Sequence, residues 1–240
     1  MIALNGLAAT YSIERDDTAH RMTVEQIAEH ESLVDRARAL APNDATALLT
    51  WGRIQIMRGR ADLALWALEK ANRLVPSYPA GHLFIAQALL MLGRTDEVRA
   101  RVERAVELSA NEPRRTSNAY SLGAEAALMR GDDEAARDLA RRGIAALPSN
   151  AFAHATLAAV DALGGRTDEA VAAMGAFRNL WPDAHRGPLR RLAPIDPSDL
   201  SRAARTSLRG LAQGGIAAAV RDATGLYASH PDPVEPSPRE

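Results

Sequence analysis

The sequence predicts an all-α protein, a solenoid of repeated helix pairs, and three observations lead to this fold class. Four glycines recur with spacings of 34, 38 and 34 residues: Gly59, Gly93, Gly131 and Gly165. Each glycine follows an apolar run and precedes a polar turn and a second run with helical spacing. Seventeen residues after each glycine stands Pro76, Ala110, Pro148 or Pro182. A fixed period in the thirties with helical patterning indicates stacked two-helix units.

Each repeated position has a physical explanation. The glycine ends the first helix, where a left-handed turn favours a residue without Cβ. Thr or Asp then opens the second helix, and acidic residues in its first turn are favourable to the helix dipole. Small residues recur where paired helices must approach closely: Gly52, Ala86, Ala124, Ala158, Ala64, Ala136 and Ala170. One repeat cannot bury its apolar face alone, so the units must stack.

The helix pairs are expected at residues 45–58 and 61–74, 79–92 and 95–109, 117–130 and 133–147, and 151–164 and 167–180. The second and third glycines are four residues further apart than the other pairs. We expect this insertion, at residues 111–116, to lie in a loop between repeats.

The pattern divides the chain into four parts. Residues 1–44 form a divergent N-terminal helical repeat, with helices expected at 2–11 and 24–40. Residues 45–184 hold the four regular repeats, and residues 185–230 hold C-terminal capping helices that cover the last apolar face. Residues 231–240, rich in proline and charge, are expected to form a disordered tail.

The glycine register, the small residues and the prolines of 45–183 resemble the tetratricopeptide repeat (TPR) family. The resemblance implies a right-handed superhelical α-solenoid whose first helices line a concave groove that binds protein segments. Its mixture of apolar, amide and charged side chains suits an extended peptide. By repeat register, the groove residues are Thr46, Leu49, Arg53, Leu83, Gln87, Asn118, Ser121, Glu125, Phe152 and Ala155.

Over residues 1–230 the chain also resembles the C-terminal repeat region of bacterial signalling proteins that carry a nucleotide cyclase or a winged-helix DNA-binding domain. The matching features are the end of the leading helix pair at 36–44, the offset third repeat at 114–146, and the segments 197–200 and 214–215. This resemblance implies an alternative function, regulation in cis of an effector domain that is absent from these 240 residues.

Composition narrows the classes of partner. Hydrophobic residues make up 47% of the chain, enough for a continuous core, and the formal net charge is −1. Basic and acidic residues are interleaved, so no global field attracts nucleic acid. Cysteine is absent, which excludes disulfides and zinc–cysteine sites. No apolar run is long enough to span a membrane, and no signal peptide is found. We expect a cytoplasmic location, with the periplasm as the alternative if a membrane-anchored effector lies upstream.

Catalytic and metal-binding patterns are not found. No pair of histidines has metal-ligand spacing on one helix, and His82 and His154 share a repeat position where packing is usual. No nucleophile elbow, P-loop or zinc-protease motif occurs. We therefore expect no enzyme activity, no cofactor and no metal. Met57, Met91 and Met129 share another repeat position, and we expect them in the core rather than at a binding surface.

The second helices carry mixed charges, as in Arg99, Arg101 and Arg104 beside Glu97, Glu103 and Glu107. A solvated face with i,i+4 pairs is the expected interpretation, with an acidic partner surface as the alternative. The leading hypothesis is a non-catalytic scaffold or sensor module that binds a protein or peptide through its concave groove, with no nucleic acid and no membrane insertion. Homo-oligomerisation stays open.

Overall fold

The computed structural model describes residues 24–180 of the chain. This range contains nine α-helices and no strand, so the predicted all-α solenoid is confirmed. The helices are α2 (Val24–Leu40), α3 (Ala45–Met57), α4 (Ala61–Leu74), α5 (Pro79–Met91), α6 (Thr95–Leu108), α7 (Pro113–Met129), α8 (Asp133–Ala146), α9 (Ala151–Leu163) and α10 (Thr167–Leu180). The helices and the tail that we predict at 2–11, 185–230 and 231–240 lie outside the described residues.

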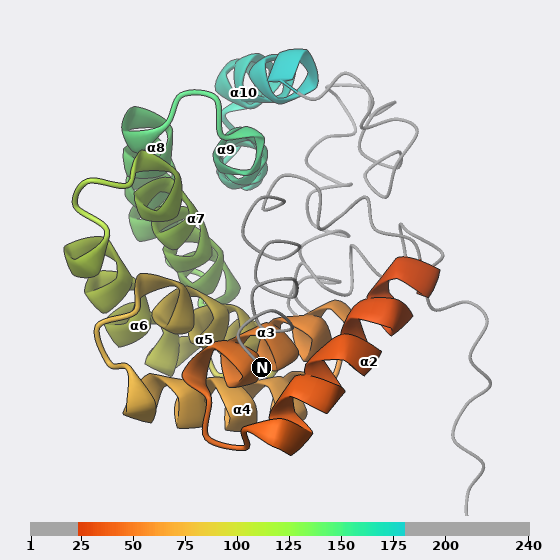
Figure 1. Cartoon of the computed structure of the whole chain (residues 1–240). Helices are drawn as coiled ribbons and strands as arrows, with labels where there is room; N and C mark the ends of the chain where they lie inside the picture. The colour runs from red at the N-terminus through yellow and green to blue at the C-terminus, as the bar shows by residue number, and fades with distance from the viewer. Residues whose placement is uncertain (1–23, 181–240) are drawn as a thin grey trace, which may run out of the picture.

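The helices form two layers of a curved stack (Figure 1). The inner layer consists of the first helices α3, α5, α7 and α9, and the outer layer consists of the second helices α4, α6, α8 and α10. Each helix packs against the next one along the chain, and α7 also contacts α5 and α9 within the inner layer. The leading helix α2 packs on α3.

The four register glycines end the first helices as predicted. Their φ angles lie between 70° and 78°, the left-handed region that favours glycine. Two backbone hydrogen bonds close each turn; at Gly59, its N–H donates to Ile56 O at 2.9 Å and the Arg60 N–H donates to Gln55 O at 2.9 Å. The same pair of bonds recurs at the other three glycines. This Schellman closure reverses the chain at one fixed angle in every repeat.

The second helices begin less uniformly than the sequence pattern predicts. Asp132 caps α8, because its side chain accepts a hydrogen bond from the Ala135 N–H. The equivalent N-cap residues of α4 and α6 are Arg60 and Arg94, whose side chains make no capping hydrogen bond. Thr95 is the first residue inside α6 rather than its cap. Acidic residues do occupy the first turns of α4, α6, α8 and α10.

The prediction of a loop at 111–116 is wrong. The insertion lengthens α7 at its N-terminus, so this first helix has 17 residues where α3, α5 and α9 have 13. Four residues are close to one helical turn, so the extension leaves the faces of the remaining helix in register. Pro113 occupies the first turn of α7, where a missing N–H costs nothing.

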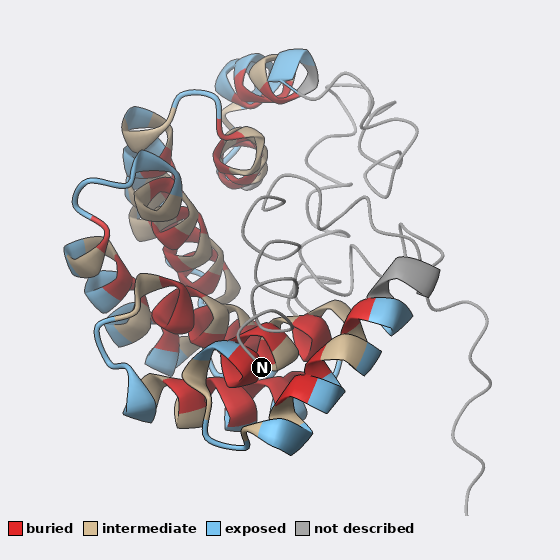
Figure 2. Ribbon diagram, viewed as in Figure 1, coloured by how far each residue is buried: buried red, intermediate tan, exposed pale blue. Residues whose placement is uncertain are grey.

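The core follows the contact between the two layers, where buried positions of neighbouring helices face each other (Figure 2). The small residues predicted at close contacts are all buried. A Cβ on Gly52 would lie 2.6 Å from Leu68 Cγ, which shows how closely α3 approaches α4. Large aliphatic side chains fill the space between the repeats, among them Leu48, Leu68, Ile85 and Leu89.

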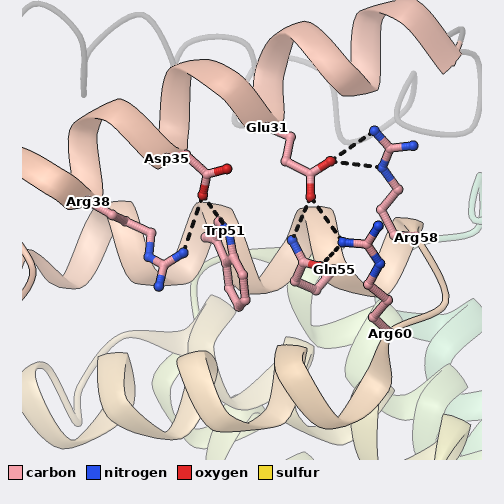
Figure 3. A network of polar contacts seen from close by, with 7 residues as sticks. All are labelled: Glu31, Asp35, Arg38, Trp51, Gln55, Arg58 and Arg60. Carbon is pink, nitrogen blue, oxygen red and sulfur yellow. Dashed lines mark hydrogen bonds and ion pairs between the residues drawn. The ribbon is translucent and has the colours of Figure 1, made fainter. Parts of the chain in front are cut away.

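A polar network joins α2 to the first regular repeat (Figure 3). Glu31 of α2 accepts hydrogen bonds from the amide of Gln55 at 3.2 Å and from the guanidinium groups of Arg58 at 3.1 Å and Arg60 at 3.3 Å. Gln55 is fully buried, and its side-chain oxygen accepts a further bond from Arg60. Burying an amide costs free energy unless its donors and acceptors are satisfied, and this network satisfies both.

A second polar network joins the third repeat to the fourth. Asp161 of α9 is buried, and its carboxylate accepts hydrogen bonds from Arg137 at 2.5 Å and Arg166 at 2.7 Å. Arg137 belongs to α8 and Arg166 to the turn before α10, so one carboxylate ties three elements together. Two cations compensate the buried charge, as a buried carboxylate requires.

We expect Gly93→Ala to destabilise the protein by about 1–2 kcal/mol, because an L-residue is strained in the left-handed region. No atom lies within 4 Å of the added Cβ, so the change in stability reports backbone strain and not a steric clash. The matched control is Gly175→Ala within α10, where the space around Cβ is also open; it should stabilise by about 0.5–1 kcal/mol. Chemical denaturation measures both changes. Shifts of the same sign in both variants would contradict the assigned turn.

We expect Ala136→Leu and Ala170→Leu each to destabilise the protein by about 1–3 kcal/mol. Both alanines have no exposed surface and pack between the layers, so a larger side chain must displace its neighbours. The measurement is the denaturation midpoint of each variant at an unchanged slope. An unchanged midpoint in both would show that these positions have room for a leucine.

Candidate functional site

The candidate site is the inner face of the inner layer, and α7 shows how this face is defined. A Cβ on Gly123 would contact Val102 of α6 and Leu139 of α8, at 3.3 and 3.4 Å, so this side of α7 points to the outer layer. Successive helical residues are rotated by roughly 100°, so Ser121 and Glu125, two residues away on either side, point roughly the opposite way. They face the inner side of the curve.

The structure divides the ten predicted groove residues by exposure. Thr46 is exposed. Six others are half-buried: Arg53, Gln87, Asn118, Glu125, Phe152 and Ala155. The remaining three, Leu49, Leu83 and Ser121, are at most 7% exposed. Binding through any of these residues stays a prediction.

Leu49, Leu83 and Ser121 occupy the same repeat position, where adjacent first helices pack against each other. The leucines belong to the main hydrophobic core. Leu49 Cδ1 would lie 3.7 Å from a Cβ on Gly81, at the start of the next first helix. The Ser121 hydroxyl donates to Ser117 O within its own helix at 3.0 Å. These three side chains offer a partner little surface in this structure.

Arg53 of α3 reaches across to the next repeat. Its guanidinium lies over the ring of Phe84 in α5, 5.5 Å from the ring centroid. Cation–π contacts of this kind stabilise by about 0.5–1 kcal/mol at partly exposed sites. The contact fixes the position of one inner-face cation and leaves it half-buried.

Asn118 takes part in a polar cluster that sequence analysis did not predict. The Asn150 amide donates to Ser117 Oγ at 2.7 Å and to Asn118 Oδ1 at 3.2 Å. Ser117 in turn donates to Gly143 O at 2.6 Å. The Asn150 side chain also accepts from the Phe152 N–H and so caps α9. An asparagine directly before an apolar helical run is a capping signal that could have identified Asn150. The side-chain oxygen of Asn118 is therefore already bonded to Asn150, at the start of α9.

Glu125 differs from every other acid of the inner face. Its carboxyl forms no hydrogen bond or ion pair with another residue in the range 24–180. Burial raises the pKa of Glu125 to about 8, and no charge in the described part of the chain opposes this shift. Part of the side chain remains accessible, so solvent or a ligand can still reach it. The other acid of the inner-layer helices α3, α5, α7 and α9, Asp161, is held by Arg137 and Arg166.

The outer layer shows the opposite arrangement of charge. Exposed ion pairs within single helices join Arg99 to Glu103 at 2.8 Å and Arg104 to Glu107 at 2.9 Å on α6. On α8, Arg142 pairs with Asp138 at 2.9 Å. The predicted solvated face is thus confirmed for these residues, with i,i+4 pairs at Arg99–Glu103 and Asp138–Arg142 and an i,i+3 pair at Arg104–Glu107. Each such pair contributes only about 0.3–0.5 kcal/mol.

Two histidines and three methionines at repeated positions have structural roles. The Nε2 atoms of His82 and His154 lie 2.9 Å from the carbonyl oxygens of Pro76 and Pro148, so each ring fixes the preceding loop, as the packing prediction implies. Burial lowers the pKa of His82. The three register methionines are partly buried and pack against the core. Among the described residues, no group of three His, Asp or Glu side chains could hold a metal ion.

We expect Glu125→Gln to stabilise the protein increasingly as the pH rises from 5 to 8. A carboxyl whose pKa is raised on folding stabilises the folded state only while protonated, so this contribution is lost as the pH passes through about 8. The free energies of unfolding of the two proteins should diverge by more than about 1.4 kcal/mol, the equivalent of one pKa unit. Denaturation at several pH values measures the difference. His82 titrates in both proteins, so its effect cancels, and a constant difference would contradict the burial of this carboxyl.

Comparison with known proteins identifies the fold. No protein-family model and no curated protein matches the sequence. Solved structures do match it. The pilF protein of Pseudomonas aeruginosa is 14% identical, covers 90% of this chain and 93% of its own, and gives a TM-score of 0.60. TTC0263, a thermophilic TPR protein of Thermus thermophilus, is 18% identical, with coverage of 86% and 98% and a TM-score of 0.58.

A third structure, YrrB, is named a TPR protein with an unusual peptide-binding site. It is 18% identical, with coverage of 76% of this chain and 85% of its own and a TM-score of 0.51. At identities this low, the likeness shows the fold alone. In the described range, no helix is long and apolar enough to cross a membrane. The structural likeness shows that the chain has the TPR fold.

Proposed function

We propose that the chain is a non-catalytic scaffold or sensor module, and that it binds a segment of a partner protein along the inner face of α3, α5, α7 and α9. The observation that carries the proposal is the contrast between the layers. Charges on the outer layer pair with each other, whereas the inner face presents half-buried polar and aromatic side chains from successive repeats. An extended segment needs such a series, because its side chains meet one repeat after another.

The comparisons support a role in protein interaction. TTC0263 and YrrB share the fold, and the name of YrrB includes a peptide-binding site. Peptide binding by this chain is our inference from that likeness and from the inner face. The comparisons do not identify a partner.

The alternative from sequence is regulation in cis of a nucleotide cyclase or a winged-helix DNA-binding domain. The structures compared above are not named as cyclases or winged-helix regulators. The alternative therefore rests on sequence resemblance only, and no observation in residues 24–180 favours it over binding in trans.

The proposal is tested with peptides selected from a random display library on the full chain. The double substitution Arg53→Ala and Glu125→Ala changes two residues of the inner face. It should weaken binding of selected peptides by roughly tenfold or more, the effect of about 1.4 kcal/mol. Peptide affinity is measured by fluorescence anisotropy and stability by chemical denaturation.

The matched control is Arg99→Ala with Glu103→Ala. It removes the same two side-chain types from the exposed outer face of α6 and should leave the affinity unchanged. The outer-face control should cost within about 0.5 kcal/mol, because both of its residues are exposed. Arg53 and Glu125 are half-buried, so denaturation must show that the inner-face variant is folded under the conditions of the binding assay. Equal binding by the inner-face variant and the wild type, or loss of binding in the outer-face control, would place the site elsewhere.

A further inference from the structure

Glu125 lies on α7, between two inner-layer helices that carry almost no charge. The 13 residues of α5 contain no Asp, Glu, Lys or Arg. The 13 residues of α9 contain only Asp161, which is paired with Arg137 and Arg166. These two helices flank α7 in the inner layer.

Several titratable groups near α7 are bonded elsewhere, among them Arg130, whose guanidinium donates to Thr95 O at 3.1 Å. In α5 and α9, the rings of His82 and His154 are bonded to the carbonyls of Pro76 and Pro148. The outer-layer helices α6 and α8 contact the opposite side of α7, through Val102 and Leu139 at Gly123. Within α7 itself, Arg115 pairs with Glu112 at the far N-terminal end. The carboxyl of Glu125 thus lacks a compensating charge among the described residues.

An uncompensated carboxylate in this position destabilises the folded chain, since burial disfavours the charged form. Glutamine would fill the same space without that cost. A residue that costs stability but remains accessible is a candidate for a contact made only when a ligand is bound. The ligand group that removes the cost is a cation, because an opposite charge at short range favours the ionised carboxyl.

We propose that Glu125 receives one cationic side chain, an arginine or a lysine, of an extended partner segment that crosses the inner faces of α5, α7 and α9. This inference rests on the proposed function and adds the chemistry of the partner. The residues on either side of the cation lie on α5 and α9 and are uncharged. Half-buried side chains there, such as Gln87 of α5 and Phe152 and Ala155 of α9, offer an amide and apolar surface.

The geometry also limits the length of the segment. Neighbouring packed helices lie about 8–10 Å apart, so crossing three of them spans roughly 16–20 Å. An extended chain covers this span with about six residues, at about 3.3 Å per residue. The segment therefore carries a single cation near its middle and uncharged residues towards both ends.

The test uses a display library of ten-residue peptides selected on the full chain at pH 8. We expect the selected peptides to contain one arginine or lysine flanked by uncharged residues. Each selected peptide is resynthesised with citrulline in place of arginine, or norleucine in place of lysine. Removing either partner of a buried charge pair should weaken binding by at least roughly 30-fold. Glu125→Gln should lower the affinity for the cationic peptide to the same extent. It should not change the affinity for the neutral analogue.

The matched control for total charge is Glu103→Gln, an exposed residue on the outer face of α6. This variant should bind the cationic peptide with the same affinity as the wild type. Affinity of the wild type should rise on the order of tenfold between pH 6 and pH 8, because a proton must leave Glu125 before the ion pair forms. Glu125→Gln should lose this dependence on pH. Circular dichroism and denaturation of each variant exclude unfolding as the cause.

The outcomes separate this inference from the proposed function. Selected peptides without a common cation, or cationic peptides that bind Glu125→Gln as tightly as the wild type, would overturn the assignment to Glu125. Provided that those peptides still lose affinity in the inner-face double variant, the binding surface itself would stand. A library that yields no peptide for the wild type would contradict the proposed function and this inference together.

Discussion

The left-handed glycine turn is the constraint on which the rest of the structure depends. At Gly59, Gly93, Gly131 and Gly165 the same backbone angle and the same two hydrogen bonds reverse the chain. Each reversal places the following helix on the outer layer, so every first helix lies in the inner layer. The close approach of the two layers then requires small residues, and those at Gly52, Ala136 and Ala170 are buried. The inner face is thus a consequence of a local backbone preference repeated four times.

The junctions between repeats differ in chemistry although they use equivalent positions. Glu31 and Arg137 each lie 11 residues before a proline, and Gln55 and Asp161 each lie four residues before a register glycine. At the first junction the residue on the second helix of the pair is an acid, Glu31 of α2. At the last junction it is a base, Arg137 of α8. At the junction of the first two regular repeats these positions are apolar, Leu65 and Leu89, and both are buried in the core. In both polar junctions the buried group is satisfied by the neighbouring repeat, as burial requires.

The fold could be predicted from the sequence because its signals are local and periodic. A glycine that ends a helix and a proline that follows the next one act within a few residues, so all helix boundaries from 45 to 180 were predicted within two residues except the start of α7. That start was wrong because four inserted residues equal about one turn, and a proline is compatible with either a loop or a first turn. The networks around Glu31 and Asp161 could not be predicted, since their partners are up to 29 residues away on other helices. Periodicity placed Leu49, Leu83 and Ser121 on the inner face but could not show that neighbouring first helices bury them.

We attribute a functional role to Glu125 because this half-buried side chain is reachable and has no compensating charge among residues 24–180. The most direct measurement is a carbon-13 NMR titration of its carboxyl carbon in the full chain, alone and with a bound cationic peptide. For the free protein we predict a pKa near the value of about 8 that burial imposes, and a marked fall in the pKa when the peptide binds. A pKa close to that of an ordinary glutamate in the free protein, or one that does not change on binding, would contradict the role assigned to this carboxyl.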